Sequence, residues 1–146
     1  DAGSAQSWGG YLEACSTDLG RMIWGTVGID TGADSTAIGG GQLNTDEIIA
    51  DDTVTNNAAN ACANLTITYN STVFDDWFLP STNEFAQLYS ALNTAGISRL
   101  NTGFPYWTST EFSADSPYDF NARWGFSEYN YQKNQDLCLT CPVRSF

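Results

Sequence analysis

Apolar side chains in the middle of the chain recur at the spacing of one helix face. Intervals of three and four residues separate Phe85, Leu88, Tyr89 and Leu92. Pro80 fixes its own φ angle and keeps the residue before it extended, so a helix can begin only after it. The pattern therefore predicts an amphipathic helix over about residues 82–94.

Both ends of this helix have local signals. Ser81 or Thr82 suits the N-cap position, and Glu84 follows at the spacing of a capping box. Gly96 suits the left-handed conformation that ends many helices. The preceding segment, residues 77–79, is predicted to be a buried strand end that leads into the helix.

The first part of the chain has weaker patterns. Residues 31–47 are rich in Gly, Thr and Asp and predict an ordered loop, with Thr45 to Glu47 as a possible helix start at its end. The Gly run at 39–41 lacks the lysine and the strand-to-helix frame of a phosphate-binding loop. Ala and Asn at helical spacing predict another helix over about residues 54–64, opening near Thr53 or Thr55.

The period changes to two after the 82–94 helix. Residues 106–111 have strand propensity, and residues 120–126 alternate apolar and polar side chains, which predicts a strand. Residues 127–136 indicate a polar, aromatic-studded turn region, and residues 137–146 a closing strand interrupted by Pro142. Two helices followed by hairpins indicate a loop-rich α+β fold with a small twisted antiparallel sheet.

Composition narrows the classes of partner. The length of 146 residues fits one domain, residues 1–146, and no apolar run is long enough to span a membrane. The formal net charge of −12, from 17 acidic and 5 basic residues, argues against nucleic acid, an anionic membrane surface or a heavily sulfated polysaccharide as the partner. Aromatic residues at 14%, with abundant Ser, Asn and Gly, suit an extracellular recognition surface.

Four cysteines, Cys15, Cys62, Cys138 and Cys141, allow three pairings. An even number fits an oxidising compartment, with reduced cysteines as the open alternative. If residues 136–141 form a strand, the Cα atoms of Cys138 and Cys141 lie roughly 10 Å apart, beyond the roughly 7 Å limit of a disulfide. Two long-range bridges from Cys15 and Cys62 to the C-terminal pair are therefore one expectation.

Catalytic and metal-binding chemistry has little support in the sequence. The chain contains no histidine, which removes the usual general base and the commonest metal ligand. No enzymatic activity and no cofactor are expected. Calcium is the weaker alternative, through the oxygen ligands of Asp51, Asp52, Asp75, Asp76, Asp115 and Asp119.

Four segments in fixed order carry a family resemblance. They are residues 35–48, 75–89 and 106–111, and the terminal Cys-Pro-Val-Arg-Ser-Phe preceded by Gln-Lys-Asn-Gln. Together they resemble the C-terminal domain of the Legionella collagen-like adhesin. Relatives of that domain include bacterial surface proteins, predatory-bacterial fibre tips, phage tail proteins and the variable proteins of diversity-generating retroelements. The first 30 residues do not match the family pattern. Before the terminal Val-Arg, this chain has Cys-Leu-Thr-Cys where the family usually has an Arg-rich segment.

The resemblance implies a C-type-lectin-like fold, shared distantly with formylglycine-generating enzymes. Many members are adhesive or receptor-binding tips, and several assemble as trimers. The residues that carry the resemblance are interpreted as core packing and buried hydrogen bonding, not as ligand contacts: Trp77, Leu79, Pro80, Trp107 and Glu111. Residues 1–30 are expected to be a stalk-facing or oligomer-specific segment.

The expected ligand surface is the outward face of residues 118–136, where retroelement-diversified relatives vary the residues that contact ligand. Aromatic rings can stack on sugars or anchor a protein patch, and amides and carboxylates can bond hydroxyl groups. The candidate ligand residues are Tyr118, Asp119, Asn121, Arg123, Glu128, Tyr129, Asn130, Tyr131, Gln132 and Asn134. An ordinary solvated hairpin is the competing interpretation.

The resulting expectation is a homotrimeric adhesion domain at the tip of a surface fibre or phage tail fibre. It would be extracellular or at the cell surface and would bind a cell-surface glycan or protein of a target cell. One alternative is a structural cap that ends a fibre and has no ligand. A second alternative is a cysteine-dependent oxidase related to formylglycine-generating enzymes.

Overall fold

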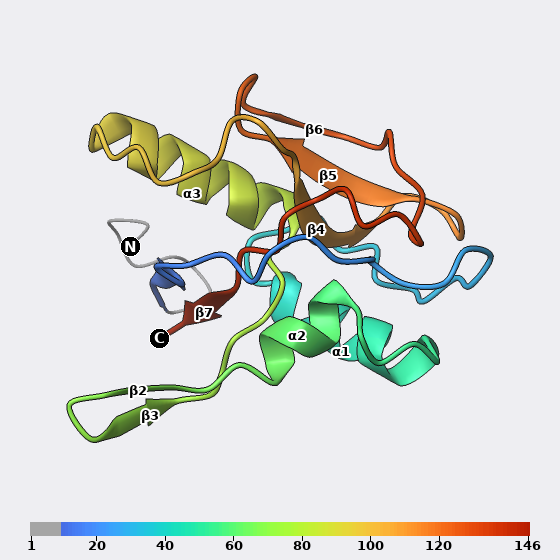
Figure 1. Ribbon diagram of the computed structural model, residues 1–146, viewed down its shortest axis with the longest axis horizontal. Coiled ribbons are helices and arrows are strands. Elements are labelled where there is room, and N and C mark those ends of the chain that lie inside the picture. The colour runs from blue at the N-terminus through green and yellow to red at the C-terminus, as the bar shows by residue number, and fades with distance from the viewer. Residues whose placement is uncertain (1–9) are drawn as a thin grey trace.

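A computed structural model describes residues 10–146 of the chain (Figure 1). The described part is an α+β domain with three helices and three small antiparallel sheets. The helices are α1 (Gly41–Asp51), α2 (Ala58–Ala63) and α3 (Thr82–Thr94). The strands are β1 (Leu12–Ala14), β2 (Ile67–Tyr69), β3 (Thr72–Phe74), β4 (Tyr106–Glu111), β5 (Pro117–Asn121), β6 (Phe126–Glu128) and β7 (Val143–Ser145). The sequence predicted two helices and one small sheet, so both numbers are corrected.

Helix α3 follows the local sequence signals closely. The Ser81 side chain accepts a hydrogen bond from the Glu84 N–H, and the Glu84 carboxylate accepts one from the Ser81 N–H at 2.8 Å. This is the predicted capping box. Gly96, with φ of +68°, follows the C-cap residue Ala95. The predicted helix is therefore confirmed at both ends.

The glycine run at 39–41 surrounds a carboxylate of the same chain. Glu84 is buried, and its carboxylate accepts a hydrogen bond from the Gly39 N–H at 2.9 Å. Helix α1 begins directly after this contact, at Gly41, with no side-chain cap on Gly40. The prediction of a loop over 31–47 is therefore wrong for its last seven residues. Burial raises the pKa of Glu84 in spite of these N–H donors.

Helix α2 is shorter than the sequence predicted. Its N-cap is Asn57, whose side chain accepts a hydrogen bond from the Asn60 N–H at 2.9 Å. Neither Thr53 nor Thr55 begins the helix. The segment between α1 and α2 is instead ordered by Asp52. Its carboxylate accepts hydrogen bonds from the Thr26 N–H at 2.6 Å and from the Val54 N–H at 2.9 Å.

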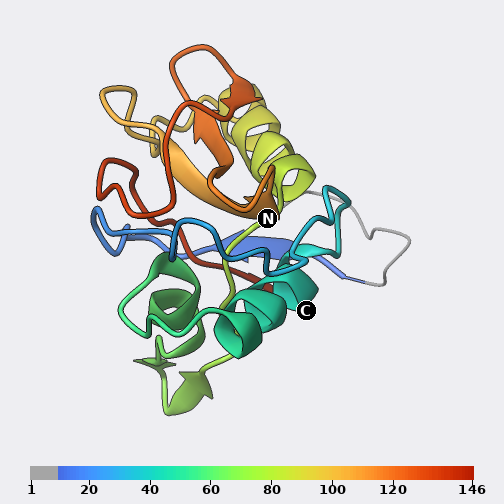
Figure 2. The same ribbon diagram turned by 90° about the vertical axis from the view of Figure 1, so that its right-hand side faces the viewer.

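The three-stranded sheet β4–β5–β6 separates two hydrophobic clusters. Tyr106 of β4 lies opposite Phe120 of β5, and both belong to the cluster that includes Phe85 of α3. The next residue of β4, Trp107, faces the other cluster together with Trp24. Figures 1 and 2 show α3 beside this sheet and α1 with α2 in a separate group. All six residues of β4 are buried, so this strand is the centre of the domain.

The predicted strand over residues 120–126 is wrong. Strand β5 ends at Asn121, a turn follows, and β6 begins at Phe126. Gly125 has φ of +78°, and its Cα packs against the Tyr89 ring. The chain therefore reverses its direction inside the segment where apolar and polar residues still alternate in the sequence. As a result, Trp124 is 61% exposed and Phe126 is 51% exposed, and neither joins Phe120 in the core.

The closing strand is also shorter than predicted. Only residues 143–145 form β7, which pairs with β1 in the register Leu12 to Ser145. Arg144 links this pair to the base of the β2–β3 hairpin, because its guanidinium binds Asp76 at 2.7 Å and Glu13 at 3.1 Å. Figure 1 shows that hairpin projecting from the body of the domain. Residues 1–30 were predicted to be a stalk-facing or oligomer-specific segment. Residues 1–9 of that segment lie outside the described residues.

A buried ion pair joins the loops on the Trp24 side of the sheet. Lys133 is 0% exposed, and its ammonium binds the carboxylate of Glu111 and the carbonyl oxygen of Ile29. The other carboxylate oxygen of Glu111 accepts from the N–H and the hydroxyl of Thr31, both at 2.9 Å. The Lys133 ammonium also lies 4.8 Å from the centre of the Trp24 ring. Three segments distant in sequence are thereby held together.

Among residues 10–146, no helix has the length and apolar character needed to cross a membrane.

Candidate functional site

Three aromatic side chains form a cluster at the end of the β4–β5–β6 sheet. The rings of Phe112 and Tyr129 are stacked with centroids 4.1 Å apart, and Tyr118 meets Phe112 edge-on at 5.3 Å. Phe112 is 48% exposed and Tyr129 is 55% exposed. Exposed aromatic rings that pack on one another form a rigid apolar surface, which is the usual character of a binding contact.

A groove of about 460 Å³ adjoins this cluster, between the first turn of α3 and the β5–β6 hairpin. Tyr118 belongs both to the aromatic cluster and to the wall of the groove. The groove is lined by Thr36, Thr82, Asn83, Ala86, Tyr118, Phe120, Gly125, Phe126 and Ser127. The lining thus combines aromatic rings with hydroxyl and amide groups, and it contains no Asp, Glu, Lys or Arg.

The sheet fixes the position of the groove through Phe120. Tyr118 and Phe120 are two residues apart on β5 and so point to the same face of the sheet. Phe120 is buried, with its ring 4.9 Å from Phe85 and 5.4 Å from Tyr89 of α3. Ser127 of β6 lies opposite Phe120 and faces the same side. The groove wall is therefore attached to the rigid core of the domain.

The start of α3 offers no free backbone donors to this groove. The Thr82 N–H binds the Thr110 hydroxyl at 3.1 Å, and the Asn83 N–H binds the Thr36 carbonyl oxygen at 3.2 Å. The Glu84 N–H is taken by the Ser81 cap. A helix N-terminus attracts anions only through unpaired N–H groups. At this helix those groups are already paired.

The structure divides the sequence-predicted ligand residues among three places. Tyr118 and Tyr129 belong to the aromatic cluster. Three residues lie on the opposite face of the hairpin, in register or two apart: Asp119, Asn121 and Glu128. The remaining five lie at the turn or in the segment after β6: Arg123, Asn130, Tyr131, Gln132 and Asn134. The predicted set is therefore not one continuous surface.

Several of these residues have local structural partners. The Arg123 guanidinium lies over the Trp124 ring at 4.9 Å. Tyr131 is half-buried, with its ring edge-on to Trp107 at 6.4 Å, and it packs against the cluster that contains Trp24. The Gln132 N–H binds the Gln135 side chain at 2.9 Å. These contacts organise the β5–β6 turn and the segment after β6, and none of Arg123, Tyr131 and Gln132 lines the groove.

Sequence reasoning missed most of the groove. In the sequence, Thr82 and Asn83 indicate only the start of a capped helix. Phe112 is only the residue that follows the predicted strand over 106–111. The alternation over residues 120–126 placed Phe126 on the same strand face as Phe120. Thr36 comes from the loop that precedes α1, so its proximity to the hairpin has no local signal. The one signal available for Phe126 was Gly125, because a glycine within an alternating segment often marks a reversal.

Asp119 is the clearest disagreement with the expected exposed surface. Its side chain is 0% exposed, and its Oδ2 atom has no hydrogen-bond partner among the described residues. The Asn130 N–H reaches the other oxygen only at 3.4 Å. Burial raises the pKa of Asp119 to about 6, and the nearby Glu128 carboxylate adds to the rise. Asp119 is therefore a buried acid, not a ligand contact on the surface.

We expect the substitution Asp119→Asn to stabilise the protein at pH 7. The raised pKa means that the folded protein holds this proton more tightly than the unfolded chain does. The Asp119 contribution to stability is therefore greatest below about pH 4 and falls as pH rises towards 6. A rise from 3.8 to about 6 sets a ceiling of roughly 3 kcal/mol for the gain at neutral pH.

Urea unfolding at pH 4 and pH 7 measures this difference, with Asp136→Asn as the control at an exposed acid. The stability gain of Asp119→Asn should be larger at pH 7 than at pH 4. An equal gain or an equal loss at the two pH values would contradict the assignment, because it would show that the carboxylate does not titrate in this range.

The four cysteines are all free and buried. Burial raises the pKa of the Cys62 thiol and raises that of Cys141 to about 12. Cys138 and Cys141 belong to different hydrophobic clusters. A buried thiol with a raised pKa is a poor nucleophile at neutral pH, because little thiolate is present. The two bridges expected from Cys15 and Cys62 stay a prediction.

Within residues 10–146, no three Cys, Asp or Glu side chains are grouped in a way that could hold a metal ion. Two of the acids considered for calcium have other partners, since Asp52 caps backbone N–H groups and Asp76 binds Arg144.

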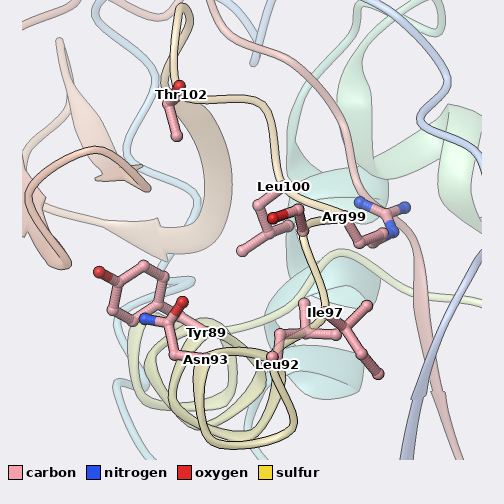
Figure 3. A pocket seen from close by; sticks show the side chains of 9 residues that line it. Tyr89, Leu92, Asn93, Ile97, Arg99, Leu100 and Thr102 are labelled. Carbon is pink, nitrogen blue, oxygen red and sulfur yellow. The ribbon is translucent and has the colours of Figure 1, made fainter.

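A second cavity, of about 220 Å³, lies at the C-terminal end of α3 (Figure 3). Tyr89 and Leu92 line it from the helix, and Ile97 and Leu100 line it from the following loop. Its one charged lining residue is Arg99, whose guanidinium binds Asp18 at 2.8 Å. The cavity is smaller than the groove beside β5, and its cation already has a partner.

Comparison of the sequence with models of known protein families gives no match, and a search of curated proteins finds no similar sequence.

Proposed function

We propose that this chain is a non-catalytic recognition domain that binds a cell-surface glycan or protein. The observation that carries the proposal is the exposed aromatic cluster of Phe112, Tyr118 and Tyr129, which continues into the groove beside α3. Exposed aromatic rings that are packed together, rather than scattered singly, are a common mark of an interaction site. The cluster is also rich in tyrosine, which is enriched in binding surfaces.

The resemblance to the collagen-like adhesin domain supports the same proposal from the sequence. From this resemblance we infer a C-type-lectin-like arrangement of the α+β fold, an extracellular position at a fibre tip, and assembly as a homotrimer. Three copies on one tip could raise avidity by roughly 10² or more when all three engage at once. The acidic net charge of −12 fits a surface-exposed protein that avoids anionic partners.

Two features favour binding over catalysis. The chain has no histidine, and burial raises the pKa of three of its four cysteines: Cys62, Cys138 and Cys141. A cysteine-dependent oxidase needs an accessible, low-pKa thiolate. The aromatic cluster has no such thiol in its surroundings and offers contacts suited to equilibrium binding.

We expect the double substitution Tyr118→Ala and Tyr129→Ala to weaken binding by roughly 10- to 100-fold. Each truncation removes an aromatic contact, and such anchors commonly contribute 1 kcal/mol or more. Binding of the fluorescently labelled chain, residues 1–146, to intact bacterial cells, intact animal cells and a printed glycan array measures the effect. Tyr69→Ala is the matched control, because Tyr69 is 68% exposed on the separate β2–β3 hairpin.

The same variants test the structural-cap alternative. If the domain only ends a fibre, neither cells nor glycans will bind the native chain, and the cluster variant will change at most its oligomeric state in light scattering. Loss of binding in the cluster variant with an unchanged oligomer would support recognition.

A further inference from the structure

We propose that the groove between α3 and the β5–β6 hairpin binds one unit of an uncharged, hydroxyl-rich saccharide. This inference rests on the recognition function proposed above and names the class of ligand and its place. It selects a glycan over a protein, and a neutral glycan over an acidic one. Three independent properties of the groove carry it: its charge, its backbone donors and its shape.

The charge of the groove excludes an acidic ligand as the preferred one. No Lys or Arg lines it, and three of the chain's five cations are paired with acids elsewhere: Arg99, Lys133 and Arg144. Carboxylated or sulfated sugars are normally bound by free cations or by unpaired backbone N–H groups. With a net charge of −12, the domain as a whole also repels them.

The backbone N–H groups at the start of α3 are also unavailable to bind an anion. Its first N–H groups are paired with Thr110, Thr36 and Ser81, so none remains for a carboxylate or sulfate. What this end of the groove offers is side-chain hydrogen bonding. The exposed Asn83 amide can donate and accept, as can the hydroxyl of Ser127. Such groups match sugar hydroxyls, which also donate and accept.

The shape of the groove fits a small ligand better than a protein surface. Its volume of about 460 Å³ lies within the range of small-molecule sites, which is roughly 300–1,000 Å³. A stable protein partner instead covers about 800 Å² on each side, over a mostly flat area. Tyr118 supplies aromatic surface for the C–H face of a sugar ring, on the same face of the hairpin as the Ser127 hydroxyl.

A glycan array with neutral, carboxylated and sulfated glycans, probed with the fluorescently labelled chain of residues 1–146, tests the proposal. We expect neutral glycans to be bound and the acidic ones not. Ser127→Ala and Asn83→Ala should each raise the half-saturating concentration roughly tenfold, because a hydrogen bond to a sugar hydroxyl is lost. Trp124→Ala is the matched control, since Trp124 is 61% exposed on the same turn and does not line the groove. Thermal unfolding of each variant checks that it is folded.

Each other outcome is informative about a different claim. Preferential binding of acidic glycans would overturn the ligand class and leave the recognition function standing. Binding to cells that is lost after protease treatment of the cells, with a blank array, would overturn the saccharide and indicate a protein receptor. Neutral-glycan binding that Ser127→Ala and Asn83→Ala leave unchanged would overturn the position of the site. Failure to bind the array and the cells alike would overturn both the inference and the proposed function.

Discussion

The substitution Lys133→Met is expected to lower the free energy of unfolding by about 3–5 kcal/mol, because it removes one partner of a buried ion pair. Lys133 is 0% exposed and is the only lysine in the chain. Its loss leaves the Glu111 carboxylate buried with only the two hydrogen bonds from Thr31. The carbonyl oxygen of Ile29 loses a donor at the same time. The loops on the Trp24 side of the sheet then lose their common anchor.

Most of the loss in stability should come from leaving the Glu111 carboxylate buried without a partner charge, and less from the loss of one contact. The double variant Lys133→Met with Glu111→Leu should therefore recover much of the lost stability, since both charges are removed together. Arg123→Met is the control, because it makes the same change in net charge at an exposed turn residue. Guanidinium unfolding followed by tryptophan fluorescence gives all four values. A single variant that loses less than about 1 kcal/mol would show that the pair is solvated and not buried.

The substitution Gly41→Ala is expected to destabilise the protein by about 2–4 kcal/mol, through overpacking and the loss of buried hydrogen bonds. A Cβ atom at this position would overlap the Oε2 atom of Glu84 and would lie 2.9 Å from the Leu79 carbonyl oxygen. Neither can move freely, because Glu84 also caps α3 and bonds the Gly39 N–H. Helix propensity alone would favour alanine by up to about 1 kcal/mol, so the sign of the effect separates the two explanations.

Gly103→Ala is the matched control for this prediction. A Cβ atom at position 103 would meet only the side chain of Asn101, at 3.2 Å, on an exposed loop. Its thermal midpoint should stay within a degree or two of the native value, on the order of surface substitutions. If Gly41→Ala raises the midpoint instead, the contact between the glycine run and Glu84 is not as close as the structure places it.

Helix α3 and strand β4 could be predicted from the sequence because their signals are local. Pro80, Ser81 and Glu84 lie next to the helix they begin, and their bonds connect residues three apart. The start of α1 has no comparable signal. Its N-cap residue is glycine, and the group that organises it is the Glu84 carboxylate, which lies 45 residues from Gly39. A single sequence does not indicate such a long-range bond.

The candidate site was harder to predict for a related reason. Alternation over residues 120–126 has the period of a strand, and the turn inside it depends on one glycine, Gly125. Misplacing that turn puts Phe126 on the same face as Phe120, whereas it lies opposite Asn121 and is 51% exposed. Asp119 was misjudged because sequence patterns assume that a carboxylate faces water, whereas the sheet holds this one against Trp107. The groove also needs Thr36 and Asn83, which only the tertiary fold brings to the hairpin.

The pairing of β1 with β7 has a consequence for the order in which the chain can fold. Leu12 and Ser145 are cross-strand partners, so closing this sheet joins residues from the two extremes of the described chain. Contacts of such large sequence separation carry a high loop-closure entropy and slow folding. The capped α3 helix and the β5–β6 hairpin can form from local contacts much sooner. During synthesis, β1 therefore cannot pair with β7 until residues 143–145 have left the ribosome.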